Sequence, residues 1–214
     1  MKEIFPGVYS IKGKIATLNS AKGYRVYGEK TFREGGKEYR IWDPNRSKVA
    51  AAIAKGLTKF PVKNNSNILY LGASTGTTSS HIADITSGKV YCIEFSRRMM
   101  RDLLNVCARK KNMIPILADA RKPGEYCHRI GPVDVLIQDV AQPDQAGILL
   151  ANQSCFGFKN AMFSIKARSI NSIRKPKQVI NEELSKLSSR FEIIEKIDLQ
   201  PFEKDHTLVS LKTR

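Results

Sequence analysis

The sequence predicts an α/β protein that is built on a mostly parallel β-sheet and preceded by a small β-rich segment. From residue 68 onward, apolar runs of strand length alternate with helical segments, which is typical of right-handed βαβ units. The last two apolar runs, 191–199 and 206–211, are joined by a short turn and must therefore run antiparallel. Residues 8–42 instead contain short alternating runs, which favour a separate antiparallel sheet.

The first 43 residues are predicted to form a small basic domain of their own. Its strands are expected at 8–11, 23–27, 30–33 and 37–42, with Gly35-Gly36 as a hairpin turn. Residues 1–63 carry 14 Lys and Arg against 5 Asp and Glu, so positive charge is concentrated at the front of the chain. These side chains either face a polyanionic partner or form a solvated surface.

The second predicted domain, 44–214, begins with a helix. Asp43 reads as its N-cap and Pro44 as its first residue, and the helix continues to Gly56-Leu57 with an apolar face. Arg46 and Lys48 would lie near its start, where cations oppose the helix dipole. That unfavourable placement favours an anionic partner, the alternative being two exposed basic residues that the helix tolerates.

The rest of the domain follows an alternating order. Strands are predicted at 68–71, 90–95, 113–118, 133–138 and 161–166, and helices at 77–85, 97–110, 143–156 and 175–189. The closing strand 206–211 starts at the sheet edge where the parallel strands end. The residues that this order brings to one edge are Gly72, Glu94, Asp119, Asp139, Lys166 and His206.

The turn after the strand 68–71 has the form expected of a nucleotide-type binding loop. Gly72 and Gly76 are four residues apart, and hydroxyl residues open the next helix. Glu94 follows 22 residues after Gly72, about where α/β folds place an acid that binds ribose hydroxyls. The glycine spacing differs from the Gly-x-Gly-x-x-Gly of dinucleotide sites.

Composition narrows the class of protein. A chain of 214 residues suits one α/β domain with a small appendage, and its net charge of +16 favours a nucleic-acid partner. The four cysteines show no metal-ligand spacing, so we expect no bound metal. We expect the cysteines to be reduced, buried thiols. No signal peptide or long apolar segment is visible, which favours a cytoplasmic protein without a membrane partner.

Several motifs together resemble the fibrillarin family in its short archaeal form. The resemblance runs along nearly the whole chain, and the segment 139–145 is specific to that family. The motifs are Tyr70-Leu-Gly-Ala-Ser-Thr-Gly-Thr-Thr78, Glu94-Phe-Ser96, Asp119-Ala-Arg121, Asp139-Val-Ala-Gln-Pro-Asp-Gln145, Ser164-Ile-Lys-Ala167 and Asp205-His206.

The resemblance implies a Rossmann-like methyltransferase fold that uses S-adenosyl-L-methionine to methylate the ribose 2′-hydroxyl of rRNA and tRNA. It also implies a box C/D guide RNA, a Nop-type scaffold protein and a kink-turn-binding ribosomal-type protein as partners, in an archaeal-type cell. The implied catalytic residues are Lys48, Asp139, Lys166 and His206. The expected cofactor-binding residues are Gly72, Ala73, Gly76, Thr77, Thr78, Glu94, Phe95, Asp119, Ala120, Asp139, Val140, Ala141 and Gln142.

Transfer to a ribose hydroxyl requires positioning and the removal of one proton. Lys166, after the fifth parallel strand, is the candidate base, with Asp139 to orient it. A lysine acts as a base only if burial or a nearby cation lowers its pKa, and Lys48 would be that cation. The sequence leaves the charge of Lys166 open.

Two other functions remain compatible with parts of the sequence. A nicotinamide-dependent oxidoreductase shares the strand and glycine turn, but lacks a closing hairpin. A non-catalytic RNA-binding scaffold explains the charge, but does not need acids after successive strands. No RNA-recognition motif is visible, so we expect the chain alone to bind RNA weakly and without sequence selection.

Overall fold

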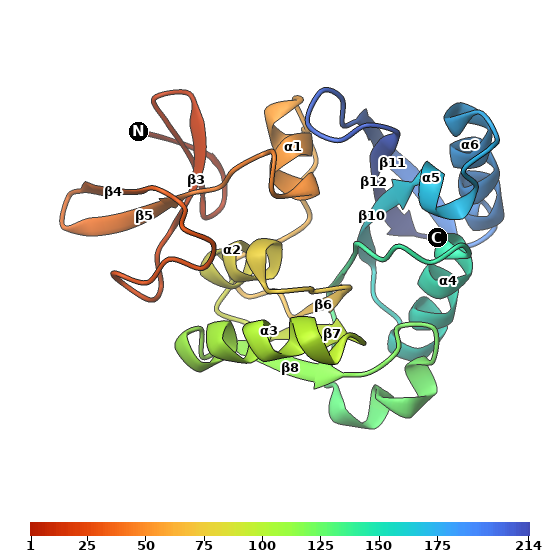
Figure 1. Ribbon diagram of the computed structural model, residues 1–214, viewed down its shortest axis with the longest axis horizontal. Helices are drawn as coiled ribbons and strands as arrows, with labels where there is room; N and C mark the ends of the chain where they lie inside the picture. Colours follow the sequence, from red (N-terminus) through yellow and green to blue (C-terminus); the bar gives the residue numbers. More distant parts are fainter.

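The computed structural model of the protein describes residues 1–214 and contains two β-sheets, with helix α1 (Lys48–Ala54) between them (Figure 1). The N-terminal sheet is antiparallel throughout and has the order β1-β2-β3-β5-β4. Its strands are β1 (Lys2–Phe5), β2 (Val8–Ile11), β3 (Lys14–Leu18), β4 (Thr31–Glu34) and β5 (Lys37–Ile41).

Three of the predicted N-terminal strands are confirmed, and β1 and β3 were missed. The β4–β5 hairpin turns at Gly35 and Gly36, both with positive φ, as expected of a turn that only glycine adopts without strain. The strand predicted at 23–27 is wrong. The amides of Val26 and Tyr27 donate to the Glu29 carboxylate at 3.0 and 2.9 Å, so they are not available to a β-ladder.

The predicted start of α1 is also wrong. Asp43 lies in a turn, where its Oδ1 accepts from the amide of Asn45 at 2.9 Å. The N-cap is Ser47, whose hydroxyl accepts from the amide of Ala50 at 3.3 Å. Arg46 therefore precedes the helix and Lys48 is its first residue, so only Lys48 lies within the helix.

The central sheet has seven strands in the order β11-β12-β10-β9-β6-β7-β8. Strand β12 pairs antiparallel with both β10 and β11, and the pairs among β10, β9, β6, β7 and β8 are parallel. This confirms the predicted sheet and its closing hairpin. The strands are β6 (Ile68–Leu71), β7 (Val90–Glu94), β8 (Met113–Leu117), β9 (Val135–Gln138), β10 (Asn160–Lys166), β11 (Phe191–Asp198) and β12 (His206–Thr213).

Helices cover both faces of this sheet, and residues along a strand alternate between two apolar cores (Figure 1). In β6, Ile68 and Tyr70 belong to the core on the side of α1 to α3, whereas Leu69 and Leu71 belong to the core on the side of α4 and α6. The remaining helices are α2 (Thr77–Ile85), α3 (Arg97–Arg109), α4 (Gln145–Phe156), α5 (Ala167–Ile170) and α6 (Pro176–Leu187), with 3₁₀ turns η1 (Pro123–Glu125) and η2 (Cys127–Arg129).

All four cysteines are free, but only Cys92 is buried. The prediction of buried thiols is therefore wrong for Cys155, which is exposed, and for Cys107 and Cys127, which are half-buried. None of the helices has the length and apolar character needed to cross a bilayer.

A buried network of charges connects the N-terminal sheet to α2 and the end of α3. Arg40 on β5 pairs with Glu29 at 2.5 Å and with Asp84 on α2 at 2.8 Å, and Lys110 pairs with Asp84 at 2.5 Å. At most 1% of each of these four side chains is exposed. We call Glu29, Arg40, Asp84 and Lys110 the sealed cluster.

Candidate active site

The ends of β6 and β9 approach each other closely at Gly72. Its φ is +79°, and a Cβ atom there would lie 2.8 Å from the carbonyl oxygen of Asp139. No other residue fits without moving the backbone that carries Asp139. Gly76 caps α2 with a φ of +90°, and it packs against Leu103 rather than facing the loop's concave side.

Glu94 ends β7 beside this loop, and its carboxylate holds two segments in place. One oxygen accepts from the amide of Ser74 and the other from the amide of Ser96, each at 2.8 Å. Glu94 is only 6% exposed. Each carboxylate oxygen has a further lone pair, so the group can still accept from a ligand hydroxyl.

A cleft of about 430 Å³ lies at the carboxyl ends of β6, β7, β8 and β9. Its lining combines apolar side chains with the Glu94 carboxylate, as is typical of a nucleoside site. The predicted cofactor residues that line it are Gly72, Glu94, Phe95, Ala120, Asp139, Val140, Ala141 and Gln142, and the cleft adds Ser74, Ile93, Ser96, Met99 and Ala118.

The other predicted cofactor residues lie elsewhere. Ala73, Thr77 and Thr78 line a second cavity of about 320 Å³. Gly76 and Asp119 line neither, and the Asp119 carboxylate is in an ion pair with Arg121. Position 119 is flanked by Ala118 and Ala120, which do face the cleft.

We call the first cavity the cofactor cleft, because most of the predicted cofactor residues line it, and the second the reaction cavity. The two cavities adjoin each other. The two share Gly72, Ser74 and Asp139. Lys48 and Lys166 line the reaction cavity only. The site therefore divides into an apolar compartment and a charged one, with Asp139 at the junction.

Asp139 contacts two lysines from opposite ends of the domain's sequence. Lys48 Nζ lies 3.2 Å from Asp139 Oδ1, and Lys166 Nζ lies 2.8 Å from the same oxygen. Lys166 also donates to the backbone carbonyl of Asp139 at 2.8 Å. Between 14% and 18% of each of these side chains is exposed, so a ligand can reach them.

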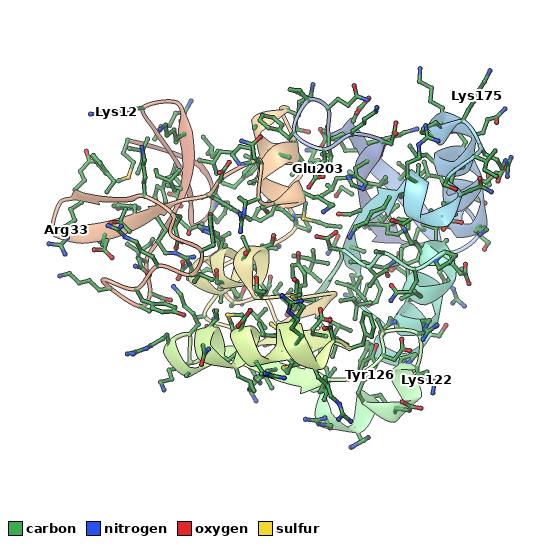
Figure 2. All side chains as sticks on the ribbon, viewed as in Figure 1. Lys12, Arg33, Lys122, Tyr126, Lys175 and Glu203 are labelled. Atoms are coloured by element: carbon green, nitrogen blue, oxygen red, sulfur yellow. The ribbon has the colours of Figure 1, made fainter.

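His206 lies at the sheet edge where the antiparallel hairpin predicts it, and it is the direct β-ladder partner of Lys166. Its Nδ1 lies 3.2 Å from Glu203 Oε2, and the other oxygen of Glu203 lies 3.5 Å from Lys48 Nζ. Glu203 stands between α1 and β12 (Figure 2). The sequence analysis missed Glu203, although it lies three residues before His206 in the hairpin loop. We call Lys48, Asp139, Lys166, Glu203 and His206 the open cluster.

The charges in the open cluster set its protonation. Burial disfavours the charged form of Lys48, but Asp139 and Glu203 outweigh burial and raise the pKa of Lys48, which stays cationic. Burial and the charge of Lys48 lower the pKa of His206 against the opposing effect of Glu203. His206 is therefore neutral at pH 7, and its Nε2 remains for another partner.

The chain is similar to proteins of known family along its whole length. A family model described as fibrillarin matches residues 1–214. The fibrillarin-like rRNA/tRNA 2′-O-methyltransferase of Methanothermobacter thermautotrophicus is 50% identical over 96% of this chain and 94% of its own.

Two solved structures are similar as well. Aeropyrum pernix fibrillarin with natively bound S-adenosyl-L-methionine is 44% identical at a TM-score of 0.87, covering 95% of this chain and 92% of its own. A chain of a fibrillarin/Nop5p complex is 36% identical at a TM-score of 0.92, and the two chains cover each other fully.

Proposed function

This chain belongs to the fibrillarin family, and from that premise we propose that it methylates ribose 2′-hydroxyls of rRNA and tRNA with S-adenosyl-L-methionine. One observation carries the proposal. A cleft suited to a nucleoside meets a cavity with two lysines on one carboxylate, and Asp139 belongs to both. Methyl transfer from a sulfonium to a hydroxyl needs such a junction, because donor and acceptor must approach in line.

The cleft fits S-adenosyl-L-methionine, which supplies an electrophilic methyl group when bound. Glu94 accepts hydrogen bonds from the ribose hydroxyls, and its buried position keeps water from competing. Phe95, Ala118 and Ala120 provide apolar surface for the base. The loop from Gly72 to Thr78, where the reaction cavity begins, would hold the methionine end.

The open cluster accepts the proton of the ribose 2′-hydroxyl. Methylation of the 2′-hydroxyl releases its proton, which must pass to a base. We assign this base to Lys166, which Asp139 holds through its carboxylate and its carbonyl oxygen. Lys48, the other lysine on Asp139, stays cationic, and Glu203 holds His206 with Nε2 free.

The chain needs partners to choose its target. Its +16 charge supplies phosphate contacts, which position RNA without reading sequence. We propose a box C/D guide RNA for sequence selection and a Nop-type scaffold to hold it, since a relative forms a complex with Nop5p. A kink-turn-binding protein would complete the particle.

The test is a methylation assay with purified protein, cofactor and a short target RNA, with and without the assembled guide particle. We expect methylation at one position only with the particle, and none on a target with 2′-deoxyribose there. Efficient single-site methylation by the protein alone would contradict the role of the guide. Calorimetry with S-adenosylhomocysteine and NAD checks the cofactor, and binding of NAD alone would end the methyltransferase proposal.

A further inference from the structure

A third cavity lies between the N-terminal sheet and α1, outside the cofactor cleft and the reaction cavity. Its volume is about 560 Å³, larger than either. It is walled by β3, β5, the segment before β4, the segment before α1 and the last residue of α1, and we call it the N-terminal groove. The residues that line it are Gly13, Lys14, Ile15, Tyr27, Gly28, Glu29, Lys30, Ile41, Trp42, Asp43, Pro44, Arg46 and Ala54.

The N-terminal groove presents free positive charge. Lys14, Lys30 and Arg46 are exposed, and none of them lies within ion-pair distance of a carboxylate. Glu29 lines the groove too, but its charge is balanced by buried Arg40. Asp43 is the remaining acid, so the groove keeps an excess of cations that suits an anionic ligand.

The groove adjoins the reaction cavity at Arg46, which lines both. Its guanidinium lies 5.7 Å from the ring centre of Tyr27. That ring is held by its hydroxyl, which contacts the Ile41 carbonyl at 3.1 Å and His81 Nε2 at 2.9 Å. A ligand that fills the reaction cavity and extends past Arg46 therefore enters a basic groove with a fixed aromatic wall.

We propose that the N-terminal groove binds the sugar–phosphate backbone of the target RNA strand, next to the nucleotide that is methylated. The inference rests on the proposed function, because it takes the RNA in the reaction cavity as its starting point. A polymer with regularly spaced phosphates fits a groove with separate cations at Lys14, Lys30 and Arg46. Phosphate contacts hold any sequence, which suits a target that base pairing selects.

The first test measures RNA binding without catalysis. Lys14→Gln/Lys30→Gln removes two groove cations and leaves Arg46, Lys48 and Lys166 in place. The matched control is Lys63→Gln/Lys159→Gln, two exposed lysines that line a cavity at the opposite edge of the sheet. Fluorescence anisotropy with a single-stranded RNA of about twelve nucleotides, titrated with salt, gives the slope of log affinity against log salt.

We expect the groove variant to lose about 1.4 from that slope, at ~0.7 for each phosphate contact with a single strand, and the control to keep the wild-type slope. An equal loss in both variants would overturn the proposal, because it would show general attraction only. An unchanged slope in the groove variant would overturn it as well. This result does not depend on methyl transfer, so it separates failure of the groove from failure of the proposed function.

The second test uses the assembled guide particle and targets that are shortened from one end at a time. We expect the wild-type protein to lose at least about tenfold in kcat/KM when the target is cut on one side of the methylated nucleotide. The groove variant should start about tenfold lower and change little on the same cut. S-adenosylhomocysteine affinity should be equal in all variants. A groove variant that responds to shortening as the wild type does would overturn the proposal.

Discussion

The protein contains two clusters in which basic side chains pair with carboxylates. One is closed to solvent and the other is accessible to a ligand. The sealed cluster has two cations and two carboxylates, all at most 1% exposed. The open cluster has two lysines, two carboxylates and a neutral histidine, with exposures between 14% and 27%. Both combine two basic side chains with two carboxylates, so access to solvent, rather than the kind of side chain, separates them.

Hydrogen bonding also separates the two clusters. Asp84 in the sealed cluster accepts from Arg40, Lys110, the Thr17 hydroxyl and both donors of Ser20. No lone pair of Asp84 is left for a ligand, and its role is to hold the N-terminal sheet to α2 and α3. Asp139 in the open cluster has only lysine partners, and both lysines face a cavity. A charged group becomes functional where its surroundings leave part of its bonding capacity unused.

The largest expected effect comes from breaking the open cluster. Lys166→Ala and Asp139→Ala should each lower the rate of methyl transfer by about 10²–10⁴-fold, the usual contribution of a positioned acid or base. Neither should alter the fold, because both side chains are partly solvated. Single-turnover assays with the guide particle measure the rate. Lys159→Ala, at the other end of β10, is the control, and near-wild-type turnover in either variant would remove that residue from the mechanism.

Breaking the sealed cluster should act on stability instead. Arg40→Met leaves Glu29 and Asp84 buried with less compensation, and loss of one partner from a buried pair costs about 3–5 kcal/mol. For a chain of this size the melting temperature should fall by roughly 6–20 °C. Calorimetry measures it, with Arg33→Met as the control because Arg33 is 72% exposed on the neighbouring strand. Equal melting temperatures in the two variants would contradict the assignment.

Glu94 combines features of both clusters. It is buried like the sealed cluster, and it faces a cavity like the open cluster. Glu94→Ala should weaken S-adenosylhomocysteine binding by at least about tenfold, since each hydrogen bond to a charged acceptor contributes ~1.5–3 kcal/mol. Isothermal titration calorimetry measures the dissociation constant. Glu125→Ala, at an exposed carboxylate, is the control. An unchanged constant for Glu94→Ala would show that the ribose is held elsewhere.

The smallest effect is expected at Glu203. A carboxylate favours the protonated imidazole, so Glu203→Gln should lower the pKa of His206 further below its ordinary value. It should also reduce turnover by about tenfold, because His206 and Lys48 lose their common partner. NMR titration of His206 and the pH profile of kcat test both points. Glu203→Asp keeps the charge and should recover part of each change, whereas a raised His206 pKa in the Gln variant would refute this role.

The sequence predicted the elements whose signals are local. The strand 68–71 with its glycine turn, the helix starting at Thr77 and the closing hairpin are all present. The spacing of apolar residues predicts whether each of these segments is a strand or a helix. A short turn between two strands allows only an antiparallel pair. The hairpin also predicts that His206 reaches the sheet edge that holds Lys166, whereas the pairing of β12 with β10 and its register come from the structure.

The sequence failed where one side chain among several nearby candidates binds the backbone amides. Glu29 captures the amides of the segment predicted as a strand at 23–27, and Ser47 outcompetes Asp43 as the cap of α1. Residue propensities predict neither outcome. Residues 23–27 have the alternating pattern of a strand, and both Asp and Ser are common helix N-caps. The same limit hid Glu203, whose contacts with Lys48 and His206 exist only after the hairpin has folded against α1.

The sequence by itself determined the alternation of strands and helices, the excess of positive charge and the acids at the strand ends. Those features depend on composition and on periods of a few residues, which every folded conformation of this chain must respect. Only the tertiary structure decided which charges are sealed and which are open. Burial depends on what packs above each side chain, and Arg40 and Lys48 differ in that packing, not in the kind of charge that they carry.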